Sequence, residues 1–280
     1  MDNYQLTQDQ ITAYGVCLRT EEHTPSTIEK YLRDTRAFAV WLEGRPVTRK
    51  LAAEWRDRLL SSGHKPSTVN SMLAAVNGLF RFLGWGIRVK FLKVQRRLFR
   101  DQSRELTRGE YDLLVNTARA AGKERLALLM EAVCATGVRV SEVKYLTVEA
   151  AQCGRAEIAL KGKIRMILLP NKLCRKLLKY ARKQKIASGE IFLTRSGRSL
   201  SRRQIWAEMK QLCKATGVAS EKVYPHNLRH LFARTFYQAC KDIARLADVL
   251  GHSSIETTRI YLVTTGAEQV RQLDRLGLVS

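Results

Sequence analysis

The sequence has little of what marks secreted, metal-binding or membrane proteins. Its six cysteines stand singly, without a Cys-x-x-Cys pair or a histidine at metal-ligand spacing. We therefore expect reduced thiols and no metal site. The longest apolar runs, such as Leu126–Met130, are far shorter than the roughly 20 residues that a membrane-spanning helix needs. The N-terminus shows no signal-peptide pattern, so we expect a cytoplasmic protein without a membrane partner.

Acidic residues are also scarce relative to basic ones. The chain has 49 Lys and Arg against 26 Asp and Glu, which gives a formal net charge of +23. An excess of this size indicates a polyanionic partner, and nucleic acid fits best because binding its phosphates releases counterions. The sequence shows no acidic trio and no Walker-type glycine loop, so we expect neither two-metal nuclease chemistry nor a nucleotide cofactor.

Capping patterns and apolar periodicity predict a mainly α-helical protein. In a capping box, a Ser or Thr begins the helix and a Glu or Gln three residues later binds back to it. This pattern occurs at Thr7–Gln10, Ser26–Glu29, Thr107–Glu110 and Ser201–Gln204. Apolar residues at helical spacing follow Ser26 and Ser67, each of which lies in a Pro-Ser-Thr triplet. We expect residues 1–90 to form a helical bundle.

The remainder of the chain predicts a linker and a second domain. The basic stretch that starts at Arg88 lacks periodicity, which favours an interdomain linker over residues 91–104, although an exposed charged helix end is the alternative. Residues 105–280 predict a helical domain around a small antiparallel sheet. Its first two strands flank the basic hairpin Lys161–Arg165, and Ile191–Thr194 is expected to add a third.

Three separated motifs carry residues suited to chemistry on phosphate. They are Ala-Thr-Gly-Val-Arg-Val-Ser-Glu-Val at 135–143, Pro-His-Asn-Leu-Arg-His at 225–230 and Leu-Gly-His-Ser-Ser-Ile-Glu-Thr-Thr-Arg-Ile-Tyr at 250–261. Each motif alone is weak, because a single Tyr or Arg is more often a packing or surface residue. In this order they resemble the tyrosine recombinase (phage integrase) family. The third motif also has that family's nine-residue gap between His252 and Tyr261.

The resemblance covers essentially the whole chain and implies a fold, a reaction and a site. It implies a SAM-like core-binding domain followed by a catalytic domain. Enzymes of this family cut DNA by forming a 3′-phosphotyrosine bond, which a 5′ hydroxyl reseals without ATP or metal. The residues that match the family's catalytic set are Arg139, Lys161, His226, Arg229, His252 and Tyr261. Lys163 remains an alternative to Lys161, because the hairpin is one residue shorter than the family's usual form.

The chemistry of these residue types agrees with the resemblance. A phosphodiester under attack gathers negative charge on its nonbridging oxygens, and the charged fork of a guanidinium suits Arg139 and Arg229 to bind them. A tyrosine hydroxyl is mostly protonated at neutral pH, so Tyr261 needs a base. The resemblance gives that role to His226, and it makes His252 a hydrogen-bond donor to the phosphate.

Three further residue assignments complete the expected site. A hairpin lysine is suited to protonate the departing 5′ oxygen. Glu142, one helical turn beyond Arg139, either orients that guanidinium or is a plain surface carboxylate. His230 is expected to be structural.

The resemblance also implies partners and location. The expected partner is double-stranded DNA, with four protomers assembled on it in a bacterial cell, near the nucleoid, and with no small-molecule substrate. Two alternatives are a type IB topoisomerase-like enzyme that relaxes DNA and a catalytically silent DNA-binding accessory protein. The C-terminal segment Ala267–Leu276 predicts a helix with one apolar side, which docks either on its own domain or on a neighbouring protomer. The sequence defines neither the target site nor the choice among integration, excision, inversion and resolution.

Overall fold

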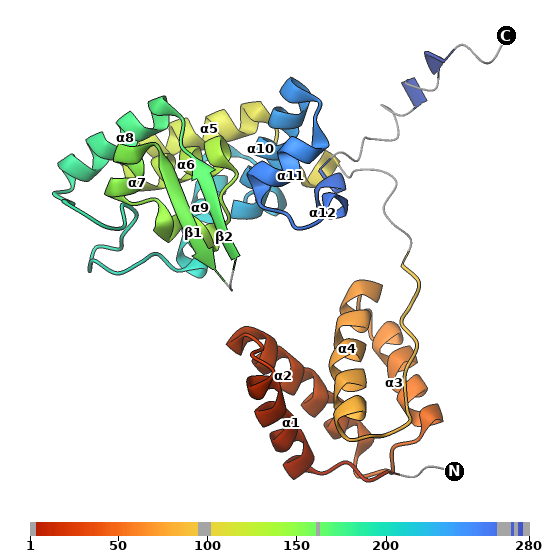
Figure 1. Ribbon diagram of the computed structural model, residues 1–280. Coiled ribbons are helices and arrows are strands. Elements are labelled where there is room, and N and C mark those ends of the chain that lie inside the picture. The colour runs from red at the N-terminus through yellow and green to blue at the C-terminus, as the bar shows by residue number, and fades with distance from the viewer. Residues whose placement is uncertain (1–3, 95–101, 161–162, 262–269, 272–273, 277–280) are drawn as a thin grey trace. The chain divides into compact units, whose positions relative to one another are not determined.

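The computed structural model describes residues 4–94, 102–160, 163–261, 270–271 and 274–276. The chain divides into two compact units, Met1–Arg96 and Arg97–Ser280 (Figure 1). Both units are mainly helical, and the second contains a two-stranded antiparallel sheet. The predicted fold class is therefore confirmed. Within the described residues, no helix has the length and apolar character that a membrane crossing requires.

The first unit is a bundle of four helices, α1 (Gln8–Thr20), α2 (Pro25–Leu42), α3 (Arg49–Ser61) and α4 (Pro66–Phe82). Its core is aromatic: the ring of Phe38 meets those of Trp55 and Phe80 edge-on, with centroids 5.0 and 5.7 Å apart. After α4 the chain runs extended along that helix. There the Asn77 amide exchanges two hydrogen bonds of 2.9 Å with the backbone of Val89, and Asn70 does the same with Leu92.

Three of the four predicted capping boxes are present, at Thr7, Thr107 and Ser201. The box predicted at Ser26 is wrong, because α2 begins at Pro25 with Thr24 as the cap and without a side-chain capping bond. Proline suits the first helical position, because its backbone angle is already helical and it has no N–H that would need a partner. Pro66 begins α4 in the same way.

The second unit is built around α6 (Glu124–Thr136), which is buried along nearly its whole length. Four longer helices surround it in Figure 1: α5 (Arg108–Ala120), α8 (Asn171–Lys183), α9 (Arg202–Thr216) and α10 (Pro225–Cys240). The shorter helical elements are η1 (Gln102–Arg104), η2 (Val140–Tyr145), α7 (Val148–Cys153), η3 (Ser220–Lys222), α11 (Ile243–Leu250) and α12 (Ile255–Arg259).

The sheet pairs β1 (Arg155–Leu160) with β2 (Lys163–Leu168), and Ile158 lies opposite Arg165. Ile158 and Ile167 are buried on the inner face, whereas Ile164, Met166 and Leu168 are exposed on the outer face. This hairpin was predicted.

The third predicted strand, Ile191–Thr194, does not form. Glu190 and Leu193 make only isolated bridges, with Thr147 and Ser199. Next to these bridges the N–H of Ile191 donates to Leu146 and that of Thr194 to Arg198.

The predicted C-terminal helix lies largely outside the described residues. Within the part that the structure describes, Val270 and Leu276 are exposed.

Candidate active site

A glycine turn at the end of α6 directs Arg139 into the site. Gly137 caps the helix with φ +65°, a conformation that favours glycine, and a Cβ at this position would collide with the ring of Phe232. Two residues later Arg139 precedes η2, and its backbone N–H donates to the Glu142 carboxylate at 2.8 Å.

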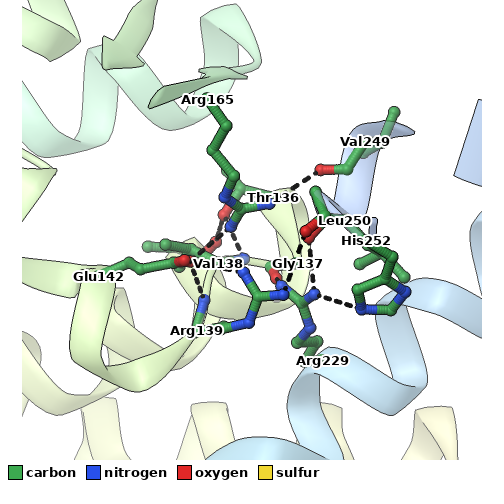
Figure 2. A network of polar contacts seen from close by, with 12 residues as sticks. Thr136, Gly137, Val138, Arg139, Glu142, Arg165, Arg229, Val249, Leu250 and His252 are labelled. Atoms are coloured by element: carbon green, nitrogen blue, oxygen red, sulfur yellow. Dashed lines mark hydrogen bonds and ion pairs between the residues drawn. The ribbon is translucent and has the colours of Figure 1, made fainter. Parts of the chain in front are cut away.

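One buried carboxylate joins two guanidinium groups (Figure 2). Glu142 is 3% exposed, and its two oxygens accept from Arg139 at 2.9 Å and from Arg165 of β2 at 2.5 Å. Burial alone would raise the pKa of Glu142, but the Arg139 amide and the charge of Arg165 lower it below its ordinary value. Glu142 is therefore an ionised positioning group rather than a surface carboxylate.

Arg229 is the most deeply buried cation of the site. Pro225 starts α10, and one turn later the guanidinium of Arg229 is 1% exposed. It donates to the carbonyl oxygens of Gly137 and Leu250 and, at 3.0 Å, to Nε2 of His252. Burial and the nearby Arg139 lower the pKa of Arg229 to about 10, so it remains charged at neutral pH. Arg229 thereby holds together the ends of α6 and α11.

The hydrogen bonds of His252 define which ring nitrogen carries its proton. Because a guanidinium only donates, Nε2 of His252 must accept from Arg229, which leaves the proton on Nδ1. Nδ1 lies 2.8 Å from the hydroxyl of Thr258, which is fully buried. Burial and the charge of Arg229 lower the pKa of His252 to about 4, so the ring is neutral at pH 7.

Tyr261 lies among histidine rings. Its ring stacks on His252 with centroids 5.9 Å apart, and it meets His230 edge-on at 4.6 Å. His230 in turn contacts His226 at 4.6 Å. Burial, together with the nearby His226, lowers the pKa of His230 to about 3. Tyr261 is only 4% exposed, so its hydroxyl is not open to a ligand in this conformation.

A cleft of about 730 Å³ opens beside this network. Arg139, His226 and Arg229 line one part of it, and Arg202 and Trp206 of α9 line another. His226 is exposed on the cleft, where partial burial and the charge of Arg229 lower its pKa. The cleft is thus lined by several cations, among them Arg139, Arg202 and Arg229.

Five of the six residues singled out from the sequence lie together. Arg139, His226 and Arg229 line the cleft. His252 joins them through its bond to Arg229, and Tyr261 through its contacts with the rings of His252 and His230. Lys161 lies outside the described residues. Lys163 begins β2, and its side chain also lies outside the description.

Sequence reasoning missed Arg165 and Thr258 as parts of the network. A signal for Arg165 existed, because it alternates with the buried Ile167 and therefore faces inward on its strand. An inward-facing cation needs a buried partner, which here is Glu142. Thr258 is the second threonine of the third motif.

Comparisons with known proteins agree with this geometry. Residues 104–267 match the phage integrase family, and residues 11–86 match the phage integrase N-terminal SAM-like domain. Tyrosine recombinase XerC of Roseiflexus castenholzii is 31% identical, covering 90% of this chain and 88% of that protein. Tyrosine recombinase XerA of Pyrococcus furiosus is 25% identical, covering 98% and 96%. A crystal structure of a lambda integrase tetramer bound to a Holliday junction aligns with a TM-score of 0.74 and 19% identity, covering 93% of this chain and 78% of that one.

These matches define a class of enzyme that carries out DNA recombination. This chain belongs to the phage integrase family, because the family match covers more than half of its length. Its activity is that of a tyrosine site-specific recombinase. The family and the enzyme class predicted from the sequence are therefore confirmed.

Proposed function

We propose that this chain cuts and rejoins double-stranded DNA through a 3′-phosphotyrosine bond to Tyr261, with four protomers on two duplexes. The observation that carries the proposal is the buried network in which Glu142 holds the guanidinium of Arg139, while Gly137 and Leu250 hold that of Arg229 (Figure 2). Arg229 also bonds to His252, whose ring stacks on Tyr261. Such rigidly held donors stabilise charge that develops on a phosphate without reorganising during the reaction.

Arg139 and Arg229 form the phosphate clamp of this proposal. Arg139 keeps 38% of its side chain exposed toward the cleft, so it is available to a nonbridging oxygen. One oxygen of the Glu142 carboxylate holds Arg139 in place, and the other oxygen binds Arg165. Each preorganised donor of this kind typically contributes a factor of 10² to 10³ in rate.

The two histidines act as neutral rings. His226 has a lowered pKa and lies on the cleft, which suits it to take the proton of the attacking hydroxyl. His252 accepts from Arg229 through the nitrogen that would face a phosphate. To donate to the phosphate, it must give up this bond, lose its Nδ1 proton to water and take a proton from water at Nε2. Nδ1 would then accept from the Thr258 hydroxyl.

Tyr261 must become accessible before it reacts, since it is 4% exposed. Displacing its ring from between His230 and His252 would bring the hydroxyl to the cleft. DNA binding to Arg139 and Arg229 is the event that we assign to this change. The 5′ oxygen then leaves with a proton from Lys161, or from Lys163 if the shorter hairpin shifts the role.

The two units divide the work on DNA in this proposal. Residues 1–90 bind DNA as a core-binding domain, and residues 105–280 form the catalytic domain. Residues 91–104 are the linker between these two domains. The net charge of +23 provides the attraction to DNA phosphates. We also infer a cytoplasmic, nucleoid-associated location, because the substrate is the DNA of the cell.

The test is covalent trapping on a pool of random-sequence duplexes, each with one nick. A strand cut near a nick loses a short fragment and cannot be resealed, so the protein stays attached. The attached DNA is recovered after denaturation with detergent and sequenced. We expect one enriched sequence with wild type and no attachment with Tyr261→Phe, which removes only the nucleophilic oxygen.

Tyr237→Phe is the matched control, because Tyr237 packs in the same hydrophobic cluster. It should attach DNA as wild type does. Attachment by the Tyr261→Phe protein would remove Tyr261 from its role. Attachment without any enriched sequence, together with relaxation of supercoiled plasmid, would indicate a topoisomerase, and failure of wild type to attach would indicate an accessory DNA-binding protein.

A further inference from the structure

The outer face of α8 carries a row of cations. Lys172, Arg175, Lys179 and Arg182 follow at spacings of three, four and three residues, which places them along one face of the helix. All four are exposed, while the opposite face of α8 is buried against α6 and α7. We call these four residues the α8 basic stripe.

Neighbouring acids do not neutralise this stripe. The helix itself contains no Asp or Glu. Two other cations of α8 take the nearby acids of α6: Lys176 binds Glu131 at 2.7 Å, and Lys183 binds Glu124 at 2.5 Å. Within the part of the chain that the structure describes, the four stripe residues have no acidic partner.

Such a stripe opposes folding rather than helping it. Like charges three and four residues apart on a helix repel one another, and here the repulsion is not offset by an ion pair. Repulsion of this kind does not help to hold α8 onto the domain, whereas a bound polyanion would relieve it.

The stripe is separate from the candidate active site. The cleft is lined by residues of η2, α9 and α10, and α8 contributes none. Figure 1 shows α8 at one end of the second unit and α10 to α12 at the other, and α6 packs against both α8 and α10. A duplex held at Tyr261 thus leaves the stripe free to bind something else.

The composition of the stripe favours DNA over an acidic protein. Protein interfaces are depleted in Lys and rely on aromatic and apolar side chains at their core. The exposed face of α8 has none of these, and every exposed residue on it is polar or basic. Phosphate contacts need only Lys and Arg, and they do not read sequence.

We propose that the α8 basic stripe binds the backbone of a second segment of duplex DNA, without sequence preference, while the cleft holds the segment to be cut. This inference rests on the proposed function, because it assumes that the enzyme works on DNA. A flanking part of the same molecule and another duplex are both possible sources of this segment.

The first experiment measures how affinity for a 60-base-pair random duplex depends on salt. The neutral variant carries Lys172→Gln, Arg175→Gln, Lys179→Gln and Arg182→Gln. If each of the four cations contacts one phosphate, the slope of log affinity against log salt falls by about 3 to 4. The matched control exchanges lysine and arginine at the same positions, as Lys172→Arg, Arg175→Lys, Lys179→Arg and Arg182→Lys, and should keep the wild-type slope.

The second experiment locates the contact on wild-type protein. Lysines are acetylated with and without saturating duplex, and the modified residues are identified by mass spectrometry. Lys172 and Lys179 should become protected by DNA. Full reactivity of both at saturating DNA, as expected if the stripe serves an acidic protein, overturns the proposal, and so does an unchanged salt slope in a neutral variant that melts like wild type.

Covalent trapping on the same proteins separates this inference from the proposed function. We expect the neutral variant to attach short nicked duplexes as wild type does, because the stripe lies away from the cleft. If the neutral variant attaches DNA normally and its slope of log affinity against log salt is unchanged, only the proposed role of the α8 basic stripe is rejected. Absence of attachment by wild type, with Lys172 and Lys179 protected, would reject the proposed function and keep the stripe as a DNA-binding surface.

Discussion

At the scale of single residues, the site depends on buried side chains that hold its arginines in position. Glu142 is ionised and buried, and each of its oxygens accepts from a different guanidinium. Removing its charge would leave Arg139 and Arg165 close together without compensation. Arg139 would then lose the orientation that points it at the cleft.

We predict that Glu142→Gln lowers the free energy of unfolding at pH 7 by about 2 kcal/mol and reduces DNA cleavage. Because the pKa of Glu142 is lowered on folding, its stabilisation is complete above the unfolded value of about 4.3 and is lost as pH falls through the lower folded value. The difference between wild type and variant should therefore shrink below about pH 4.3. Urea denaturation across pH measures this.

Glu124→Gln is the control for that series, since Glu124 is paired with Lys183 but both side chains are largely exposed. It should change stability by less than about 1 kcal/mol. A Glu142 effect no larger than the Glu124 effect would show that the buried network is unimportant.

At the scale of elements, the helix ends bring the site together. Gly251 caps α11 with φ +63°, and a Cβ on it would collide with the side chain of Arg165. The backbone carbonyl of Gly251 also accepts from Arg139 at 3.4 Å. The carbonyls of Val249 and Leu250 accept from Arg165 and Arg229, so the end of α11 contacts all three guanidinium groups.

We predict that Gly251→Ala reduces covalent trapping of DNA at least tenfold, because Arg165 must move and pull on Glu142. Gly217→Ala is the matched control for Gly251→Ala. Gly217 also caps a helix, α9, with φ +67°, but it has open space around it. Both substitutions carry a left-handed backbone penalty of about 1 kcal/mol. The collision with Arg165 adds to this penalty only at Gly251, so Gly251→Ala should melt below Gly217→Ala. Trapping is measured well below both melting temperatures, and equal trapping by the two proteins would contradict the role of Gly251.

The hairpin between β1 and β2 poses a chemical question that a modified substrate answers. When sulfur replaces the 5′ bridging oxygen, the cut strand leaves as a thiolate, which needs no proton. We predict that Lys161→Ala is defective on ordinary DNA and regains cleavage on the sulfur substrate. If the sulfur substrate instead rescues Lys163→Ala, and Lys161→Ala cleaves both substrates, then Lys163 is the general acid.

At the scale of the whole molecule, each unit has a hydrophobic core of its own. The first unit's clusters gather around Phe38 and Ile11, and the main cluster of the second unit surrounds α6. Basic residues are spread over both units, from the bundle to the α8 basic stripe. This division fits an enzyme that binds DNA over a long surface and performs chemistry in one cleft.

Local sequence signals determined much of this protein. The capping boxes at Thr7, Thr107 and Ser201 formed as predicted, because a cap depends on residues three positions apart. The order of the three motifs indicated the family, and the spacing of His226 and Arg229 predicted one helix for both. The net charge indicated a polyanionic partner.

Only the tertiary structure decided which of these side chains are buried and paired. Arg165 meets Glu142 across 23 positions of sequence, and Tyr261 is covered by rings from α10 and the end of α11. The predicted strand at Ile191–Thr194 did not form, because pairing there stops at two isolated bridges, Thr147 with Glu190 and Leu193 with Ser199. Burial and ion pairing depend on neighbours distant in sequence, which local periodicity does not encode.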